Sequence, residues 1–200
     1  MKKLLYTFLA VSIIFSACEK EEEEPTNNTN NNNSGNSTNL AIGDSHQGGI
    51  IFYLDGNGSG LIAAPTDQSN AAEWGCEGTN LSEADGTAIG TGNQNTVYIE
   101  SGCTTPGIAA DICANLTLGG YSDWFLPSID ELKEMYVNKD AINTTAIANG
   151  GSSFTFNRYW SSTDLASPPF NRAWGQNFYN DEPFFSNKSY PHFVRAVRAF

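Results

Sequence analysis

The span between Trp160 and Phe193 combines polar side chains with aromatic rings. Its polar residues include Asp164, Arg172, Asn177, Asn180, Asp181 and Glu182, and its aromatic residues include Phe170, Tyr179, Phe184 and Phe185. Aromatic rings beside carboxylates and amides suit the binding of a sugar or a peptide, and the same oxygens also suit calcium. This span is predicted to form the ligand-binding face. The alternative is that the rings pack back on the domain and the carboxylates only solubilise it.

No residue pattern typical of catalysis is found. The two histidines, His46 and His192, are far apart, and no Gly-x-Ser-x-Gly sequence accompanies them. Asp130, Glu131 and Glu134 would suit acid catalysis of glycoside hydrolysis, but a helix start explains them better. The cysteines and histidines also lack the spacing of a zinc site. We therefore expect a protein that is not an enzyme, with no catalytic residues, no cofactor and no metal, calcium being left open.

The stretch from Gly119 to Leu132 predicts the element around which the domain is organised. A Gly-Gly turn precedes a short aromatic strand that includes Trp124, and Pro127 ends this strand because it has no N–H to donate. Ser128 and Glu131 have the spacing of a capping box, so a helix should begin at Ser128.

Apolar runs and turn residues predict the remaining elements. Helices are expected over 105–116, 128–138 and 141–148, and strands over 49–54, 61–64, 158–163, 172–178 and 193–200. The turn between the first two strands contains Asp-Gly and Asn-Gly, which indicates a hairpin rather than a calcium loop. Residues 66–102 show little periodicity and are expected to form a long loop, and 180–183 a turn. The first and last strands are expected to pair.

The cysteines of the exported part predict one disulfide. Cys76 and Cys103 lie in glycine-flanked loops, whereas Cys113 lies in an apolar helical pattern. We therefore pair Cys76 with Cys103 and expect Cys113 to be a buried free thiol.

The N-terminal region has the features of a lipoprotein leader. Residues 1–17 have a positive start and an apolar run, and the sequence Phe-Ser-Ala before Cys18 resembles a bacterial lipobox, with Phe15 where Leu is usual. The alternative is an ordinary secretory signal. Residues 18–39 are then a lipidated, acidic and Asn-rich disordered tether, and 40–200 a single domain.

The acidic run at 19–24 resembles the export signal of Bacteroidetes surface lipoproteins, the alternative being a plain charged spacer. We expect a protein anchored by Cys18 in the outer membrane and exposed on the cell surface. Its net charge of −12 argues against a nucleic-acid partner.

Four sequence pieces occur in the order of a known family. They are residues 120–128 with Glu131 and Leu132, residues 159–163, Ala173 and Trp174 with Phe178, and residues 194–198. Together they resemble the C-terminal domain of Legionella collagen-like adhesins, which also occurs in bacterial surface lipoproteins as a domain of unknown function. A more distant similarity is to the formylglycine-generating-enzyme and C-type-lectin-like folds.

The resemblance implies an α+β, C-type-lectin-like domain with small twisted antiparallel sheets, two or three helices and long loops. It does not imply catalysis, and our first hypothesis is a binding or adhesion module for an extracellular glycan or protein. A cell-envelope hydrolase or modifying enzyme on the same scaffold, or a structural envelope protein, are the alternatives.

Several residues of the matching pieces are assigned structural roles: Trp124, Pro127, Ser128, Glu131, Trp160, Trp174, Arg195 and Arg198. Trp160 and Trp174 are expected to fill the core, the alternative being that they stack on sugar rings. Alternation along the last strand places Arg195 and Arg198 on opposite faces, so one of them needs a buried carboxylate. Glu131 is the first candidate for this partner and Asp123 the second.

Overall fold

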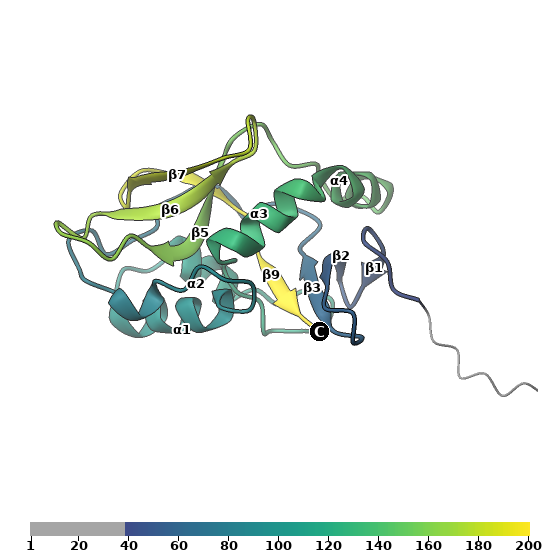
Figure 1. The fold of residues 1–200 in the computed structure, drawn as a ribbon, viewed down its shortest axis with the longest axis horizontal. Helices are drawn as coiled ribbons and strands as arrows, with labels where there is room; N and C mark the ends of the chain where they lie inside the picture. Colours follow the sequence, from purple (N-terminus) through teal and green to yellow (C-terminus); the bar gives the residue numbers. More distant parts are fainter. Residues whose placement is uncertain (1–38) are drawn as a thin grey trace, which may run out of the picture. The chain divides into compact units, whose positions relative to one another are not determined.

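Two small sheets and four α-helices make up the part of the chain that the computed structural model describes, residues 39–200 (Figure 1). The predicted α+β class is confirmed, with more helices than the two or three expected. The predicted signal peptide, Cys18 and nearly all of the predicted tether lie outside the described residues. No helix between residues 39 and 200 has the length and hydrophobicity needed to cross a membrane.

The first sheet contains the predicted hairpin. Its strand order is β1 (Ser45–His46), β2 (Gly49–Leu54), β3 (Gly60–Ala63) and β9 (Val197–Ala199), and all neighbours are antiparallel. The Asp55 carboxylate accepts the backbone N–H groups of Asn57 and Ser59, at 2.7 and 3.1 Å, which closes the turn. The final strand pairs with β3, the second arm of this hairpin, rather than with the first strand.

The second sheet has five strands. Their order is β4 (Ser69–Ala72), β8 (His192–Val194), β5 (Arg158–Asp164), β6 (Arg172–Asn177) and β7 (Glu182–Asn187). Only the pair of β5 and β8 is parallel. Strand β7 begins inside the stretch expected to be a turn, so the β6–β7 turn, residues 178–181, lies two residues earlier than predicted.

The helices are α1 (Gly92–Gly102), α2 (Ala109–Ala114), α3 (Ile129–Val137) and α4 (Lys139–Ala148). The expectation of a loop over 66–102 is wrong, because this stretch contains both β4 and α1. Helix α1 buries Gly92, Asn95, Thr96 and Ile99, so its inner face is largely polar and has no apolar periodicity. Helix α2 is shorter than predicted, because Ile108 before it is extended.

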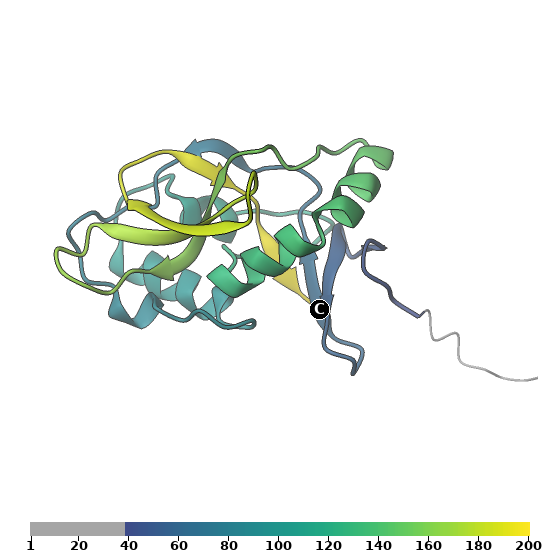
Figure 2. The same ribbon diagram turned by 45° about the horizontal axis from the view of Figure 1, so that its top comes forward.

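Helix α3 starts as predicted and links the two sheets. The Ser128 hydroxyl accepts the Glu131 N–H, and the Glu131 carboxylate accepts the Ser128 N–H at 2.8 Å, which completes the capping box. Burial raises the pKa of this carboxyl. In both ribbon views α3 runs from the strands β5 and β6 to the β2–β3 hairpin (Figures 1 and 2). Leu132 and Met135 on its inner face are fully buried.

The tryptophans differ in burial. Trp74, Trp124 and Trp160 are buried in the core, as expected for Trp160. Trp174 is only half-buried, so its prediction as a core residue is wrong. The reason is its place on β6, where its ring lies beside exposed Phe185 of the outer strand β7.

The predicted terminal strand is divided between the two sheets. Strands β8 and β9 are separated by Arg195 and Ala196. Arg195 donates to Asp67 at 2.7 Å, and Arg198 pairs with Asp123. Both arginines are buried, so each needs a carboxylate partner. Glu131 is not that partner, because its carboxylate accepts the backbone N–H groups of Ser128 and Gly90. The second candidate, Asp123, is confirmed as the partner of Arg198.

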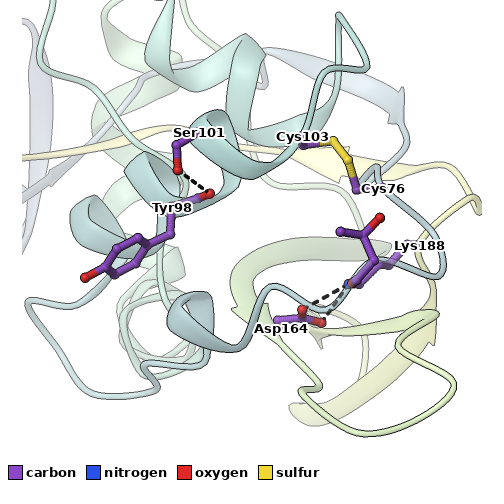
Figure 3. Close-up of a disulfide and its surroundings, with 7 residues drawn as sticks. Cys76, Tyr98, Ser101, Cys103, Asp164 and Lys188 are labelled. Carbon is purple, nitrogen blue, oxygen red and sulfur yellow. Dashed lines mark hydrogen bonds and ion pairs between the residues drawn. A yellow bond between two sulfur atoms is a disulfide. The ribbon is translucent and has the colours of Figure 1, made fainter.

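The predicted disulfide is present. Cys76 and Cys103 are bonded, with their Cα atoms 5.6 Å apart (Figure 3). It joins the end of α1 to the loop after β4. Cys113 is a free, buried thiol, as predicted, and burial raises the pKa of this group.

Candidate functional site

Asp164 does not belong to a ligand-binding face, contrary to the prediction. Its side chain is fully buried at the end of β5, and its oxygens lie 2.9 and 3.0 Å from Nζ of Lys188, which is equally buried (Figure 3). Lys188 also donates to the Thr79 carbonyl at 3.3 Å and lies 4.5 Å from the Trp74 ring centroid. Burial raises the pKa of Asp164 and lowers that of Lys188, and the ion pair opposes both shifts. This carboxylate therefore holds the interior together.

Four of the predicted residues gather at the β6–β7 turn. The Asn177 side chain accepts the Tyr179 N–H at 3.0 Å, and Asn180 donates to Glu182 at 2.6 Å. These groups bond to one another and shape the turn. Asp181 instead reaches across to α3, where it pairs with Lys133. In residues 39–200, no three His, Cys, Asp or Glu side chains come together as metal ligands.

A groove lies between α3 and the strands β6 and β7. Its volume is about 430 Å³, and it is lined by Thr87, Ile129, Asp130, Lys133, Trp174, Gln176 and Pro183. Helix α3 contributes three of these residues, since positions separated by three or four lie on one helical face. The sheet contributes Trp174 and Gln176, which alternation places on the same face of β6, and Pro183, which is paired with Gln176.

Aromatic rings extend the groove along the outer strands. Trp174 and Phe185 are cross-strand partners with ring centroids 5.5 Å apart and an interplanar angle of 87°. The Arg172 guanidinium lies 4.8 Å from the Phe185 centroid, and Phe185 is 50% exposed. Of the residues predicted to bind a ligand, Phe185 therefore adjoins the groove through its contact with Trp174, and Arg172 adjoins it through Phe185.

The other predicted aromatic residues do not form one platform. Tyr179 is exposed and packs edge-on against exposed Phe156. Phe184 turns to the opposite face of β7 and contacts Trp160 and His192. Phe170, beyond the end of β5, is half-buried. The predicted face therefore divides, because neighbouring residues on a strand point to opposite sides of the sheet.

Gln176 is the most constrained polar group of the groove. Its side chain is fully buried, and its Nε2 donates to Oδ1 of Asp181 at 2.9 Å. Nζ of Lys133 lies 2.6 Å from the same oxygen. Oε1 of Gln176 is buried without a hydrogen-bond partner. An unpaired buried acceptor costs about 1–3 kcal/mol, so it is a group that a bound donor would stabilise.

Sequence reasoning missed most of the groove. It assigned Asp130 to the first helical turn, Ile129 to the apolar face of that helix and Pro183 to a turn, and it gave no role to Thr87, Lys133 or Gln176. The capping box did predict the start of α3, and hence which of its residues share a face. The packing of that face on β6 depends on contacts between segments about 45 residues apart, which no local pattern indicates.

Two of the other cavities in the described part of the chain are larger than 300 Å³, and a third, of about 300 Å³, lies beside β1 and Asn149. One, of about 500 Å³, lies between α1 and the Trp124 loop and includes Glu100, whose pKa is raised by burial and by nearby Asp111. The other, of about 400 Å³, is polar and lies beside Cys76 and Lys188. None of the three is lined by a buried acceptor without a hydrogen-bond partner, so the groove at Trp174 is the best candidate site.

The described residues form an α+β domain with a surface groove in which Trp174 is the aromatic lining residue. Residues 65–198 match the Lcl C-terminal domain, and the chain belongs to this family. The domain is thus related to surface adhesins. No curated protein matches the chain. The match begins after β3 and ends within β9, the strand with which β3 pairs.

Proposed function

We propose that this protein is a surface-exposed bacterial lipoprotein whose domain binds an extracellular, uncharged glycan in the groove at Trp174. The observation that carries the proposal is the half-exposed Trp174 ring in a groove that also holds a buried, unpaired amide oxygen. The membership of an adhesin-related family supports a binding role.

The chemistry of the groove suits a sugar ring. Trp174, Ile129 and Pro183 offer apolar surface to the C–H face of the ring, while Asp130 and Thr87 offer polar atoms to its hydroxyls. The net charge of −12 opposes the binding of a polyanion, which favours an uncharged ligand. No histidine lines the groove, and Lys133 neutralises Asp181 beside it, so binding is better supported than hydrolysis.

The binding proposal is tested with Trp174→Ala. Isothermal titration calorimetry measures the affinity of the protein for cellohexaose, mannohexaose and chitohexaose. We expect at least one to bind, and the variant to bind it about tenfold or more weakly, which corresponds to about 1.4 kcal/mol. Tyr179→Ala is the matched control, because Tyr179 is an exposed aromatic residue outside the groove. Equal losses in both variants, or no binding by the wild-type protein, would contradict the proposal.

The anchor is tested with Cys18→Ala. Lipidation of Cys18 would hold the protein in the membrane, so the variant should move to the soluble fraction and lose palmitate labelling. A variant that still fractionates with membranes and keeps its lipid label would show that the anchor lies elsewhere. Protease treatment of intact cells then tests whether the domain is exposed on the surface.

A further inference from the structure

We infer that Asp181 determines the specificity of the groove, because it orients the Gln176 amide so that only a hydrogen-bond acceptor is left for a ligand. The inference rests on the proposed glycan-binding function and deepens it. The ligand class is a glycan that places a free hydroxyl, as a donor, against Oε1 of Gln176.

The argument starts from the shared oxygen of Asp181. Oδ1 accepts Nε2 of Gln176 at 2.9 Å and lies 2.6 Å from Nζ of Lys133. Lys133 belongs to α3, Gln176 to β6 and Asp181 to the turn after β6, so this oxygen joins three segments around the groove. Lys133 and Gln176 both line it.

A carboxylate at this position removes the usual freedom of a glutamine amide. An ionised carboxylate only accepts hydrogen bonds, so Gln176 has to turn its NH₂ group towards Asp181. The reversed orientation would bring Oε1 against a negatively charged oxygen. Oε1 therefore keeps its position on the other side of the amide, where it has no partner.

The backbone holds Asp181 in place. Its φ is +63°, a left-handed conformation that Asp and Asn adopt more readily than most residues. Its N–H donates to the Asn177 carbonyl at 3.1 Å, which closes the turn, and Lys133 holds the side chain from the opposite side. The orientation of Gln176 thus depends on a short turn that is bonded at both ends.

The consequence is a selective groove. A hydroxyl group donates to Oε1 and removes the cost of leaving that buried acceptor unpaired. An O-methyl group or a carboxylate at the same place has no proton to donate and leaves the oxygen unpaired, so such ligands bind more weakly. Gln176 has no exposed surface, so part of the groove wall has to move before a ligand reaches Oε1. The half-exposed side chain of Lys133 is the part of the wall that we expect to move.

The test compares Asp181→Asn with the wild-type protein on two ligands. The first is whichever of cellohexaose, mannohexaose or chitohexaose binds the wild type, and the second is its O-methylated derivative. We expect the wild type to prefer the free hydroxyls by about 100-fold or more, and Asp181→Asn to lower this preference to below about tenfold, because the amide can then reverse. Glu182→Gln is the matched control, since Glu182 is the neighbouring carboxylate and bonds to Asn180, not to Gln176.

A second measurement needs no ligand. The side-chain NH₂ protons of Gln176 should exchange slowly in the wild type and in Glu182→Gln, and faster in Asp181→Asn, as seen by NMR. If exchange is unchanged in Asp181→Asn, or if that variant discriminates between the two ligands as the wild type does, the inference is wrong while the glycan site stands. If no hexasaccharide binds the wild type, the proposed function fails and the assigned ligand class fails with it.

Discussion

The buried ion pair of Lys188 and Asp164 makes the sharpest test of how the interior is stabilised. Replacing Lys188 by Met keeps the apolar stem of the side chain over Trp74 but removes the charge. The Asp164 carboxylate then remains buried without its partner, and the Thr79 carbonyl loses its bond from Nζ. Breaking one partner of a buried pair costs about 3–5 kcal/mol.

This cost is large on the scale of the whole domain. The free energy of unfolding of a native domain is about 5–15 kcal/mol, so Lys188→Met removes a large share of it. At about 2–4 °C per kcal/mol, the midpoint of thermal unfolding should fall by roughly 6–20 °C. The double variant Asp164→Leu with Lys188→Met removes both charges and should recover much of the loss, because an apolar pair of similar size avoids the cost of desolvation.

The assay is urea unfolding at pH 7, followed by tryptophan fluorescence, which Trp74 next to Lys188 should report. Lys133→Met is the matched control, because the side chains of its ion pair with Asp181 are 42% and 37% exposed. An exposed pair is worth at most about 1 kcal/mol. In Lys188→Met the loss should shrink as the pH falls, since the buried carboxyl, whose pKa is raised, can then take up a proton. If Lys188→Met and Lys133→Met lower the free energy of unfolding equally, the buried pair of Lys188 and Asp164 does not stabilise the interior more than an exposed pair does.

Two further predictions concern other parts of the fold. Burial, together with Arg158, lowers the pKa of His192 to about 4, so the free energy of unfolding should fall by about 2–3 kcal/mol as the pH falls from 6.5 towards 4. In His192→Phe, urea unfolding should show a smaller fall between pH 6.5 and 5. The same dependence on pH in the variant and the wild type would contradict this. In Gly92→Ala the added Cβ would clash with the Glu131 carboxylate, so the unfolding free energy should fall by about 1–3 kcal/mol. Asn93→Ala, at an exposed position of the same helix, should change it by under about 0.5 kcal/mol.

Local patterns in the sequence determined several elements correctly. The turn at Asp55 and the capping box of Ser128 and Glu131 are formed by hydrogen bonds between residues two to four positions apart, so the chain itself carries the whole signal. The pairing of Cys76 with Cys103 followed from the different surroundings of Cys113. The α+β class and the family followed from the order of motifs along the chain.

Tertiary contacts decided the elements that the sequence misassigned. Helix α1 buries a polar face, in which Asn95 bonds to the Gly86 carbonyl and Thr96 to that of Leu126, so hydrophobic periodicity could not indicate it. Buried arginines predict that carboxylate partners exist, but not which ones. Asp67 is 128 positions from its partner Arg195, and only the folded chain brings them together.

The same reason separates the predicted ligand-binding face from the groove. The composition of residues 160–193 indicated a surface with aromatic and polar groups, and Trp174, Phe185 and Asp181 do lie at or beside the groove. Asp164 was predicted to belong to the same face, because the sequence does not distinguish an exposed carboxylate from one that is paired with a buried lysine. In the folded chain Asp164 is paired with Lys188. A residue type states which bonds a side chain can make. Which of them it makes depends on the packing of α3 against β6 and of β5 in the interior, where segments distant in sequence bring their side chains together.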